Sequence, residues 1–319
     1  MRSLKILAFV AASLASGMSS AAALTASQIL SQFNVVATTT LTSGHDIEGR
    51  VVAGEITGGA TFYNNPRGAA SSYAAINAIK IDSFNANINN GGSVNYQTSD
   101  AAHFNFNGGG SASYQSTPFA MSDFTTPLNA LALQLAQLSA NSTVNANDPN
   151  NFTFNVTPDS TGTAVFNLTT AQLSASRNIV FSGTAQTIII NVTGTSFIDT
   201  TNFNANSFLN THIIWNFENA TSLSFTGWHG AVLAGNAAVT NSSAMEGFLY
   251  ANSFTGNGEL HDYGFAGTLP TVLTPATPAA QVPEPGVLAL FLTGALGLLG
   301  MAALRRRGQR QLPEVAGAR

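Results

Sequence analysis

The fold is decided by Gly230-Ala231-Val232-Leu233-Ala234, a stretch whose pattern returns 17 residues later as Gly247-Phe248-Leu249-Tyr250-Ala251. A third copy lies far upstream as Gly49-Arg50-Val51-Val52-Ala53. A step of this length suits one coil of a β-solenoid, in which each coil buries its apolar face only by stacking on its neighbours. The position of the upstream copy predicts that distant parts of the chain stack on one another.

This repeat favours a mainly β chain folded as a β-solenoid, or β-helix. A β-sandwich would also use many short strands, but a repeated step is what the stacking of coils requires. We expect the core to include apolar residues of all three copies, with Leu233 the most firmly inward: Val51, Val52, Val232, Leu233 and Leu249.

Four other segments alternate strictly between apolar residues and Asn or Thr: 84–89, 103–107, 152–156 and 202–206. This period of two places Phe and Ile on one face of a strand and the polar residues on the other. We expect the Asn side chains of adjacent strands to form amide ladders, as in cross-β assemblies. The segment 145–151 lacks the alternation and is expected to be a loop around Pro149.

One or two short accessory helices are also expected. The first spans 25–34, where Thr25 suits the N-cap and Gln28 completes a capping box. The second starts near Pro127, because proline suits the first turn of a helix. Its apolar side would carry Leu128, Leu131, Leu135 and Leu138.

The N-terminus has the pattern of a secretory signal peptide. Arg2 and Lys5 form a basic start, residues 6–14 are apolar, and Ala21 and Ala23 offer a small-x-small cleavage site before Leu24. We therefore expect residues 1–23 to be removed on export.

The C-terminus carries three signals in a row: Val282-Pro283-Glu284-Pro285, an apolar run of 18 residues over 287–304, and Arg305-Arg306-Arg307. The run is long enough to cross a hydrocarbon core as a helix, and the arginines predict a cytoplasmic tail over 308–319. Together the signals over 282–307 resemble the PEP-CTERM sorting signal of Gram-negative bacteria. The resemblance implies an inner-membrane-anchored precursor that an exosortase processes for the cell surface or the extracellular matrix. The alternative is an ordinary membrane anchor.

Charge is scarce between the two ends. Residues 24–281 hold thirteen acidic residues and four basic ones, Arg50, Arg67, Lys80 and Arg177. Nucleic acid and anionic membrane surfaces are poor partners, because phosphates are bound by clustered Lys and Arg. The chain has no cysteine, so the exported part must be stable without disulfides. Its polar residues are mainly Asn, Ser and Thr, which suit uncharged glycan contacts.

A second resemblance rests on the two ends of the exported part. The opening motif is His45-Asp46-Ile47-Glu48-Gly49-Arg50-Val51-Val52-Ala53-Gly54, and the closing segments are 230–239, Glu246-Gly247, 258–261 and 265–267. These are similar to motifs of the choice-of-anchor A family of bacterial surface proteins, although Gly54-Glu55 and Ala234-Gly235-Asn236 depart mildly from them. The resemblance implies an adhesive β-helix domain over 24–269, similar to ice-binding adhesive domains, without catalytic residues. A stiff Pro/Thr/Ala linker over 270–281 follows.

Candidate catalytic chemistry is sparse. The five histidines are scattered, and no cysteine is available to bind zinc. The densest group, Glu259-x-His261-Asp262, could hold a metal with one further ligand, but a structural hydrogen-bond site is the favoured interpretation. We expect no metal, no cofactor and no catalytic residue. A glycosidase needs only two carboxylates at the right separation, and Glu246 with Glu259 is the first pair to consider.

The sequence therefore predicts an exported, non-enzymatic surface or matrix protein with an adhesive or structural role. Its expected partners are an exosortase and an exopolysaccharide or cell-surface glycan, and its C-terminal helix meets the membrane before processing. A glycoside hydrolase-like enzyme is the alternative, which two carboxylates facing each other in a cleft would favour. Ice binding is a distant alternative, because it needs a flat, regular Thr array and the threonines are irregularly spaced.

Overall fold

The computed structural model describes residues 23–99, 103–115 and 118–270. Several predicted segments lie outside the described residues: the signal peptide up to residue 22, the linker beyond Pro270, Val282-Pro283-Glu284-Pro285, the apolar run and Arg305-Arg306-Arg307. Within the described ranges, no helix is both long enough and apolar enough to span a membrane.

The described chain is mainly β, as predicted, and its strands pair in parallel except for the β9–β10 pair. The largest sheet has twelve strands. Ten of them follow one another in the order β11 (Thr163–Thr169), β13 (Thr187–Thr193), β16 (Ile213–Asn216), β19 (Ala231–Asn241), β21 (Leu249–Gly256), β1 (Val35–Ser43), β2 (Val51–Gly58), β4 (Ile76–Ile81), β6 (Val94–Ser99) and β8 (Ala112–Tyr114). The other two, β14 (Ser196–Ile198) and β17 (Ser222–Phe225), join through the second half of β19.

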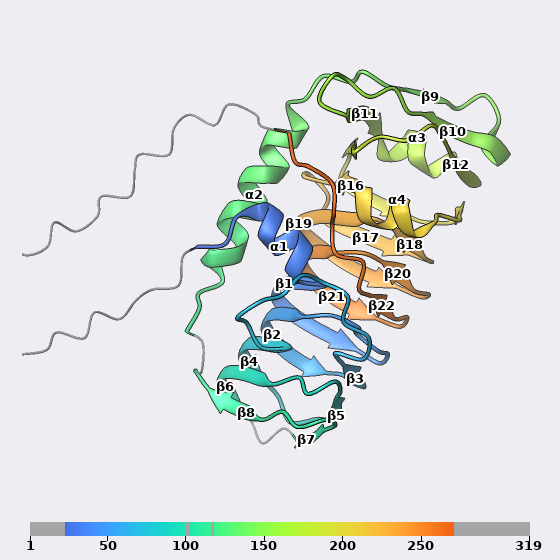
Figure 1. The fold of residues 1–319 in the computed structure, drawn as a ribbon. Coiled ribbons are helices and arrows are strands. Elements are labelled where there is room, and N and C mark those ends of the chain that lie inside the picture. The colour runs from blue at the N-terminus through green and yellow to red at the C-terminus, as the bar shows by residue number, and fades with distance from the viewer. Residues whose placement is uncertain (1–22, 100–102, 116–117, 271–319) are drawn as a thin grey trace, which may run out of the picture. The chain divides into compact units, whose positions relative to one another are not determined.

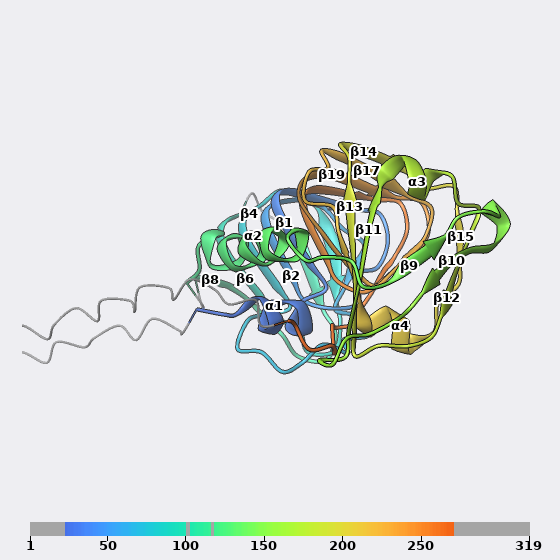
Figure 2. The same cartoon turned by 90° about the horizontal axis from the view of Figure 1, so that it is seen from above.

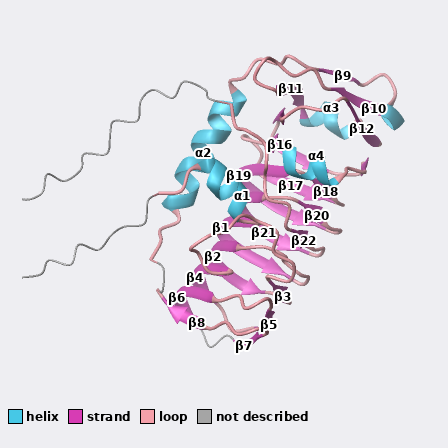
Figure 3. Ribbon diagram, in the orientation of Figure 1, coloured by secondary structure: helices cyan, strands magenta, loops and turns pink. Residues whose placement is uncertain are grey.

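Three smaller sheets complete the coils. One contains β18 (Trp228–His229), β20 (Met245–Glu246) and β22 (Leu260–His261), and another contains β3 (Thr61–Phe62), β5 (Asn85–Ile88) and β7 (His103–Phe106). The third contains β15 (Asn202–Phe203), β12 (Asn178–Ser182), β10 (Phe152–Asn155) and β9 (Thr143–Asn145). The ribbon shows these strands stacked in successive layers (Figures 1 and 3).

A single coil can be followed through β19. Its register shifts between Ala234 and Ala238, where the chain turns a corner, and the chain then turns again into β20. The next coil begins with β21, whose Leu249 pairs with Val232. The 17-residue repeat is therefore one coil of the stack, as the sequence predicts.

The stacking order differs from the order of the chain. Val35 pairs with Leu249 on one side and with Val51 on the other, so β1 lies between the second repeat copy and the upstream copy. The predicted stacking of distant segments is confirmed. In Figure 1 the first coils, in blue, lie directly beside the last ones, in orange.

The core has two parts on opposite faces of the large sheet. Val51, Val232 and Leu249 belong to the cluster inside the coils, together with apolar residues of the smaller sheets. Val52 and Leu233 are fully buried too, but they belong to a second cluster beneath α1 and α2. The predicted inward placement of Leu233 is therefore wrong, because strand alternation turns it away from the interior and a helix covers it there.

Four α-helices occur in the described residues: α1 (Ala26–Gln32), α2 (Ser122–Ala136), α3 (Thr170–Ser174) and α4 (Ser207–His212). The capping box of Thr25 and Gln28 at α1 is confirmed. The predicted start of the second helix is wrong: α2 begins at Ser122, so Pro127 lies inside the helix. Its apolar side is confirmed for Leu128, Leu131 and Leu135, which are buried, whereas Leu138 lies beyond the end of the helix at Ala136. Helix α2 runs along the stack beside the large sheet (Figures 1 and 2).

The two short helices α3 and α4 exceed the expected number. Helix α3 has a capping box formed by Thr169 and Gln172, and α4 is capped by Asn206. Asn206 belongs to the segment 202–206 that alternation assigns to a strand, but β15 ends at Phe203. Residues 149–151 form a 3-10 turn, η1 (Pro149–Asn151), within the predicted loop.

The predicted amide ladders are present on the strands' outer face. The Nδ2 of Asn105 donates to Asn87 Oδ1 over 3.3 Å, and the Nδ2 of Asn107 donates to Asn89 Oδ1 over 2.8 Å. Alternation along β5 buries Ala86 and Ile88 while Asn85 and Asn87 stay exposed. Each coil thus contributes apolar groups to the interior and neutral hydrogen-bonding groups to the surface.

Candidate functional site

A charged cluster lies where the first and last coils stack. Ile47 forms parallel bridges to both Leu260 and Phe62, which brings the opening and closing motifs of the sequence together. The residues next to the buried Ile47 and Leu260 point to the other face, because strand side chains alternate. Glu48 and His261 therefore meet outside the coils, beside Glu246 of the preceding coil, which pairs with His261 in the ladder.

His261 is held by two carboxylates. Its Nδ1 lies 2.7 Å from Glu246 Oε1, and its Nε2 lies 2.7 Å from Glu259 Oε2. The hydrogen bond to Glu246 raises the pKa of His261 to about 9, against a smaller opposing effect of burial. The imidazole is therefore protonated at neutral pH, with both ring nitrogens acting as donors.

A second carboxylate pair closes the same junction. The Oε2 of Glu48 accepts the backbone N–H of Asp262 over 2.9 Å, and the Oδ2 of Asp262 accepts the N–H groups of Arg67 and Gly68 over 2.7 and 2.8 Å. Burial raises the pKa of Asp262. These bonds tie the loop after β3 to the end of β22.

We call the cluster of Glu48, Glu246, Glu259, His261 and Asp262 the clasp, because its hydrogen bonds join the first and last coils. Neither nitrogen of His261 has a free lone pair for a metal, because each donates to a carboxylate. The described residues include no group of three or more His, Cys, Asp or Glu side chains arranged to hold a metal ion. The pair Glu246 and Glu259 does come together, but through the imidazole of His261, which bridges the two carboxylates.

Acid–base chemistry needs a carboxyl group whose pKa is raised. For Glu246, burial acts to raise the pKa, but the hydrogen bond and the charge of His261 lower it on balance. The described surface has hollows beside Asn216, Asn87, Tyr63 and His212. Among the residues that line these four hollows, Glu218 is the one with a carboxylate. The arrangement favoured by the enzyme alternative, two facing carboxylates in a cleft, does not occur in these four.

A column of hydroxyl groups runs along the outer face formed by the second halves of the long strands. Ladder pairs join Ser224 to Thr240, Thr240 to Thr255, and Thr255 to Thr42. Thr42 in turn shares a hydrogen bond with Thr57 of the next coil. We call these five residues the Ser/Thr column. Neighbouring parallel strands lie about 4.8 Å apart, so the four hydroxyls from Ser224 to Thr42 repeat at that interval. Thr57 lies off this register, because Thr42 pairs with Gly58 in the ladder.

The Ser/Thr column is absent from the sequence-based expectations because the corners have different lengths. The register shifts between Ala234 and Ala238 in β19, and between Ala37 and Thr40 in β1. The threonines are therefore unevenly spaced along the chain, and the out-of-order stacking places Thr42 beside Thr255. A signal did exist: in β1, β19 and β21 an exposed or half-buried Thr directly follows a buried apolar residue.

Comparison with known protein families matches residues 26–262 to the Ice-binding-like adhesive domain. The chain belongs to this family. The match covers the whole stack of coils and both halves of the charged clasp. No curated protein sequence matches the chain at a significant level.

Solved ice-binding proteins are similar to this ice-binding-like adhesive domain at low identity. An ice-binding protein from an Antarctic biological consortium is 15% identical, with 74% of this chain and 89% of the other covered and a TM-score of 0.32. The ice-binding protein 1 domain from Shewanella frigidimarina is 13% identical, with 73% and 95% covered and a TM-score of 0.33. One from the ascomycete Antarctomyces psychrotrophicus is 10% identical, with 73% and 95% covered and a TM-score of 0.28.

Proposed function

We propose that this ice-binding-like adhesive domain is a non-enzymatic β-solenoid adhesin that binds polysaccharide at the bacterial surface or in the extracellular matrix. The match of residues 26–262 to the adhesive family carries this proposal. The absence of facing carboxylates in the four hollows supports it against the glycosidase alternative.

The composition of the surface supports neutral contacts with the glycan. Outward positions of the coils are occupied by Asn, Ser and Thr, as in the ladders of Asn87 with Asn105 and Asn89 with Asn107. Each such contact is weak, but many copies on one surface add up through multivalency. Salt screens only charged contacts, so we expect binding to persist at high ionic strength.

We propose that the C-terminal signal directs the domain to the bacterial surface or the extracellular matrix. Val282-Pro283-Glu284-Pro285, the apolar run and Arg305-Arg306-Arg307 support processing by an exosortase. The signal peptide ending at Ala21 and Ala23 supports export. The choice-of-anchor A resemblance agrees with both, since that family joins one adhesive domain to interchangeable anchors.

Co-sedimentation with matrix isolated from the producing bacterium tests the adhesive proposal. The purified full-length chain should sediment with the matrix equally well at low and high salt. Loss of binding at high salt would contradict the neutral-contact mechanism. The length of the glycan chains is followed in parallel: shortening that Glu246→Gln or Glu259→Gln removes would overturn the adhesin proposal in favour of an enzyme.

Ice binding is a second candidate of equal standing, so its ranking as distant on sequence grounds is corrected. Two observations favour it. One is the description of the family, and the other is the Ser/Thr column, which forms an array of hydroxyl groups that the spacing of threonines in the sequence does not show. The test is thermal hysteresis of the purified chain. Thr240→Tyr and Thr255→Tyr should abolish it, while Thr200→Tyr, at an exposed residue outside the column, should not. A chain without hysteresis at any concentration excludes this function.

A further inference from the structure

One ladder of Asn side chains differs from the others because it ends in a buried acceptor without a donor. It joins Asn167 of β11, Asn191 of β13 and Asn216 of β16. The Nδ2 of Asn216 donates to Asn191 Oδ1 over 2.9 Å, and the Nδ2 of Asn191 donates to Asn167 Oδ1 over 3.0 Å. All the amides therefore point the same way along the stack.

The same three side chains hold the C-terminal end of α2. Their Nδ2 groups also donate to the carbonyl oxygens of Leu138, Leu135 and Ala132, over 3.1, 2.8 and 2.9 Å respectively. The three amides thus fasten the last turn of α2, and the Leu138 carbonyl just beyond it, to the large sheet. Both N–H groups of Asn216 are used in this way, which fixes the orientation of its amide.

The ladder stops at Asn216 because the residue paired with it in the next coil is Leu233. A leucine has no donor to offer, so Asn216 Oδ1 has no hydrogen-bond partner within the described protein. The side chain is 2% exposed. A buried acceptor without a donor costs about 1–3 kcal/mol, so its retention calls for a partner from outside the chain.

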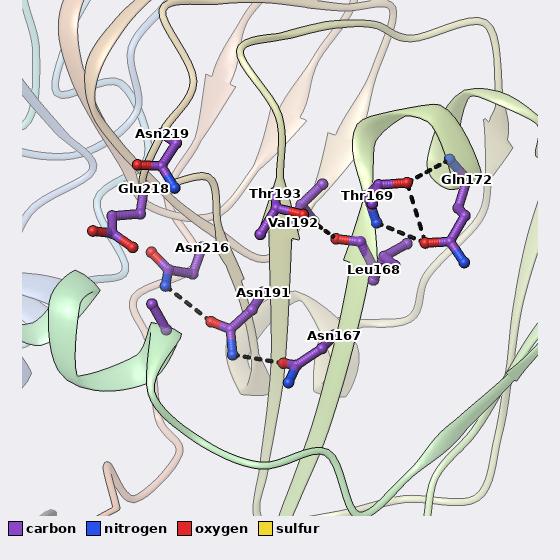
Figure 4. A pocket seen from close by; sticks show the side chains of 11 residues that line it. Asn167, Leu168, Thr169, Gln172, Asn191, Val192, Thr193, Asn216, Glu218 and Asn219 are labelled. Atoms are coloured by element: carbon purple, nitrogen blue, oxygen red, sulfur yellow. Dashed lines mark hydrogen bonds between the residues drawn. The ribbon is translucent and has the colours of Figure 1, made fainter.

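A hollow of about 260 Å³ lies at this end of the ladder. Figure 4 shows the oxygen of the Asn216 amide directed away from Asn191, on the side where Glu218 and Asn219 are drawn. The lining combines polar side chains with the apolar Ala136, Leu168 and Val192, and it comes from α2, β11, α3, β13, β16 and the turn after β16. Its hydrogen-bonding side chains include Thr169, Gln172, Thr193, Glu218 and Asn219.

The chemistry of this hollow selects a ligand rich in hydroxyl groups. Asn216 Oδ1 and the Glu218 carboxylate both need donors, while Asn219 and Gln172 can donate and accept. An anion is disfavoured beside Glu218, and no basic side chain lines the hollow. Its volume lies just below the usual range for small-molecule pockets, which suits one ring of a longer chain.

We propose that this hollow is a subsite for one neutral saccharide unit, a hydroxyl of which donates to Asn216 Oδ1. The proposal rests on the glycan-binding function proposed above and names one place where the glycan is held. The open side of the hollow lets the rest of the polysaccharide extend along the surface.

The test measures binding of the full-length chain to neutral hexasaccharides, size-fractionated from the producer's own matrix, by isothermal titration calorimetry. Asn219→Trp fills the hollow from an exposed position and should weaken binding at least tenfold. Glu218→Gln removes one acceptor and should weaken it about threefold to tenfold. Asn204→Trp is the matched control, because Asn204 is an exposed asparagine outside the hollow, and it should bind like the wild type.

Asn216→Ala should abolish hexasaccharide binding, but it also removes the donor to the Ala132 carbonyl of α2 and the donor to Asn191, so its melting temperature is measured alongside. If the Asn216→Ala chain is unfolded, the binding of hexasaccharide to the Asn219→Trp variant tests the subsite instead. Matrix binding that persists unchanged in Asn219→Trp and Glu218→Gln would overturn the subsite while leaving the adhesive function intact. A wild-type chain that fails to sediment with matrix contradicts the adhesive function itself. Binding abolished by a calcium chelator would overturn the subsite in favour of an ion at Glu218.

Discussion

At the residue scale, glycine is required where the coils of β19 and β21 turn into the large sheet. Gly230 and Gly247 have φ values of +97° and +144°, which side-chain-bearing residues rarely adopt. A Cβ on Gly247 would lie 2.5 Å from the carbonyl oxygen of Gly230, so the coils also approach too closely for any side chain. The stack continues from Gly247 to the first coil, where the Nδ2 of Asn34 donates to Gly247 O over 2.7 Å.

We predict that Gly247→Ala destabilises the fold by more than the backbone cost of about 1–3 kcal/mol, because the contact with Gly230 adds to it. Gly109→Ala is the control. Gly109 also has a positive φ, +98°, but no atom lies within 4 Å of its added Cβ. Urea unfolding of both variants separates the two costs, and equal losses of stability in the two would show that the close approach is unimportant.

The clasp at His261 makes a further prediction at this scale, on pH. The folded pKa of about 9 exceeds the ordinary value of 6.5. The clasp therefore stabilises the protein fully below about pH 6.5 and loses its effect as the pH rises through about 9. Glu246→Gln should lower the free energy of unfolding by about 1.5–3 kcal/mol at pH 6. The difference from the wild type should vanish above pH 9; a difference unchanged at pH 9.5 would falsify this assignment.

At the scale of elements, the first halves of the central strands of the large sheet are buried on both faces, which explains what sequence patterns could and could not predict. The repeat copies predict the stacking correctly because each supplies one strand per coil. Residues 231–234 are continuously apolar, as expected for a parallel strand covered on both sides. Without alternation, nothing in the sequence says which residues face the interior and which face α2, and Leu233 was assigned to the wrong face.

The start of α2 was mispredicted for a related reason. Its N-cap residue, Met121, makes no side-chain capping bond, so the usual start signal is missing. Pro127 suits the first turn of a helix, but it lies inside this one. For the candidate site, the sequence identified Glu246, Glu259 and His261 as candidate residues. The Ser/Thr column could not be predicted, because it depends on the number of residues at each corner of the coil, which only the structure supplies.

We predict that Leu233→Asp prevents folding, although Leu233 lies beneath α2 and not inside the coils. The substitution would bury an unpaired charge between the sheet and the helix, at a cost of several kcal/mol. Leu133→Asp is the matched control, because Leu133 is 52% exposed on the same helix. Circular dichroism and thermal melting distinguish them: a Leu233→Asp chain that melts like the Leu133→Asp chain would refute the burial argument.

At the scale of the whole molecule, the described residues form one compact unit that ends at Pro270, before the proposed sorting signal. The clasp residues lie at the junction between the two halves of the stack, which accounts for the two sequence motifs that resemble the choice-of-anchor A family. They are separated along the chain but in contact through Ile47 and Leu260. The two motifs therefore mark a seam in the fold.

Processing gives a prediction at the same scale. If Pro283-Glu284-Pro285 is an exosortase site, the mature protein lacks residues 287–319. Replacing the three residues with Ala should leave uncut precursor in the inner membrane. Mass spectrometry of the C-terminus measures this directly, and surface protein from a wild-type host that still carries Arg305-Arg306-Arg307 would rule it out.

The position of β1 between β2 and β21 has a consequence for the time at which the protein matures. A chain that crosses a membrane from its N-terminus delivers β1 long before β21, so one edge of β1 stays open until the last coil arrives. An open edge can accept a strand from a second chain. Two copies that fold side by side can thus exchange their final coils, and slow or crowded folding would favour such swapped pairs over monomers.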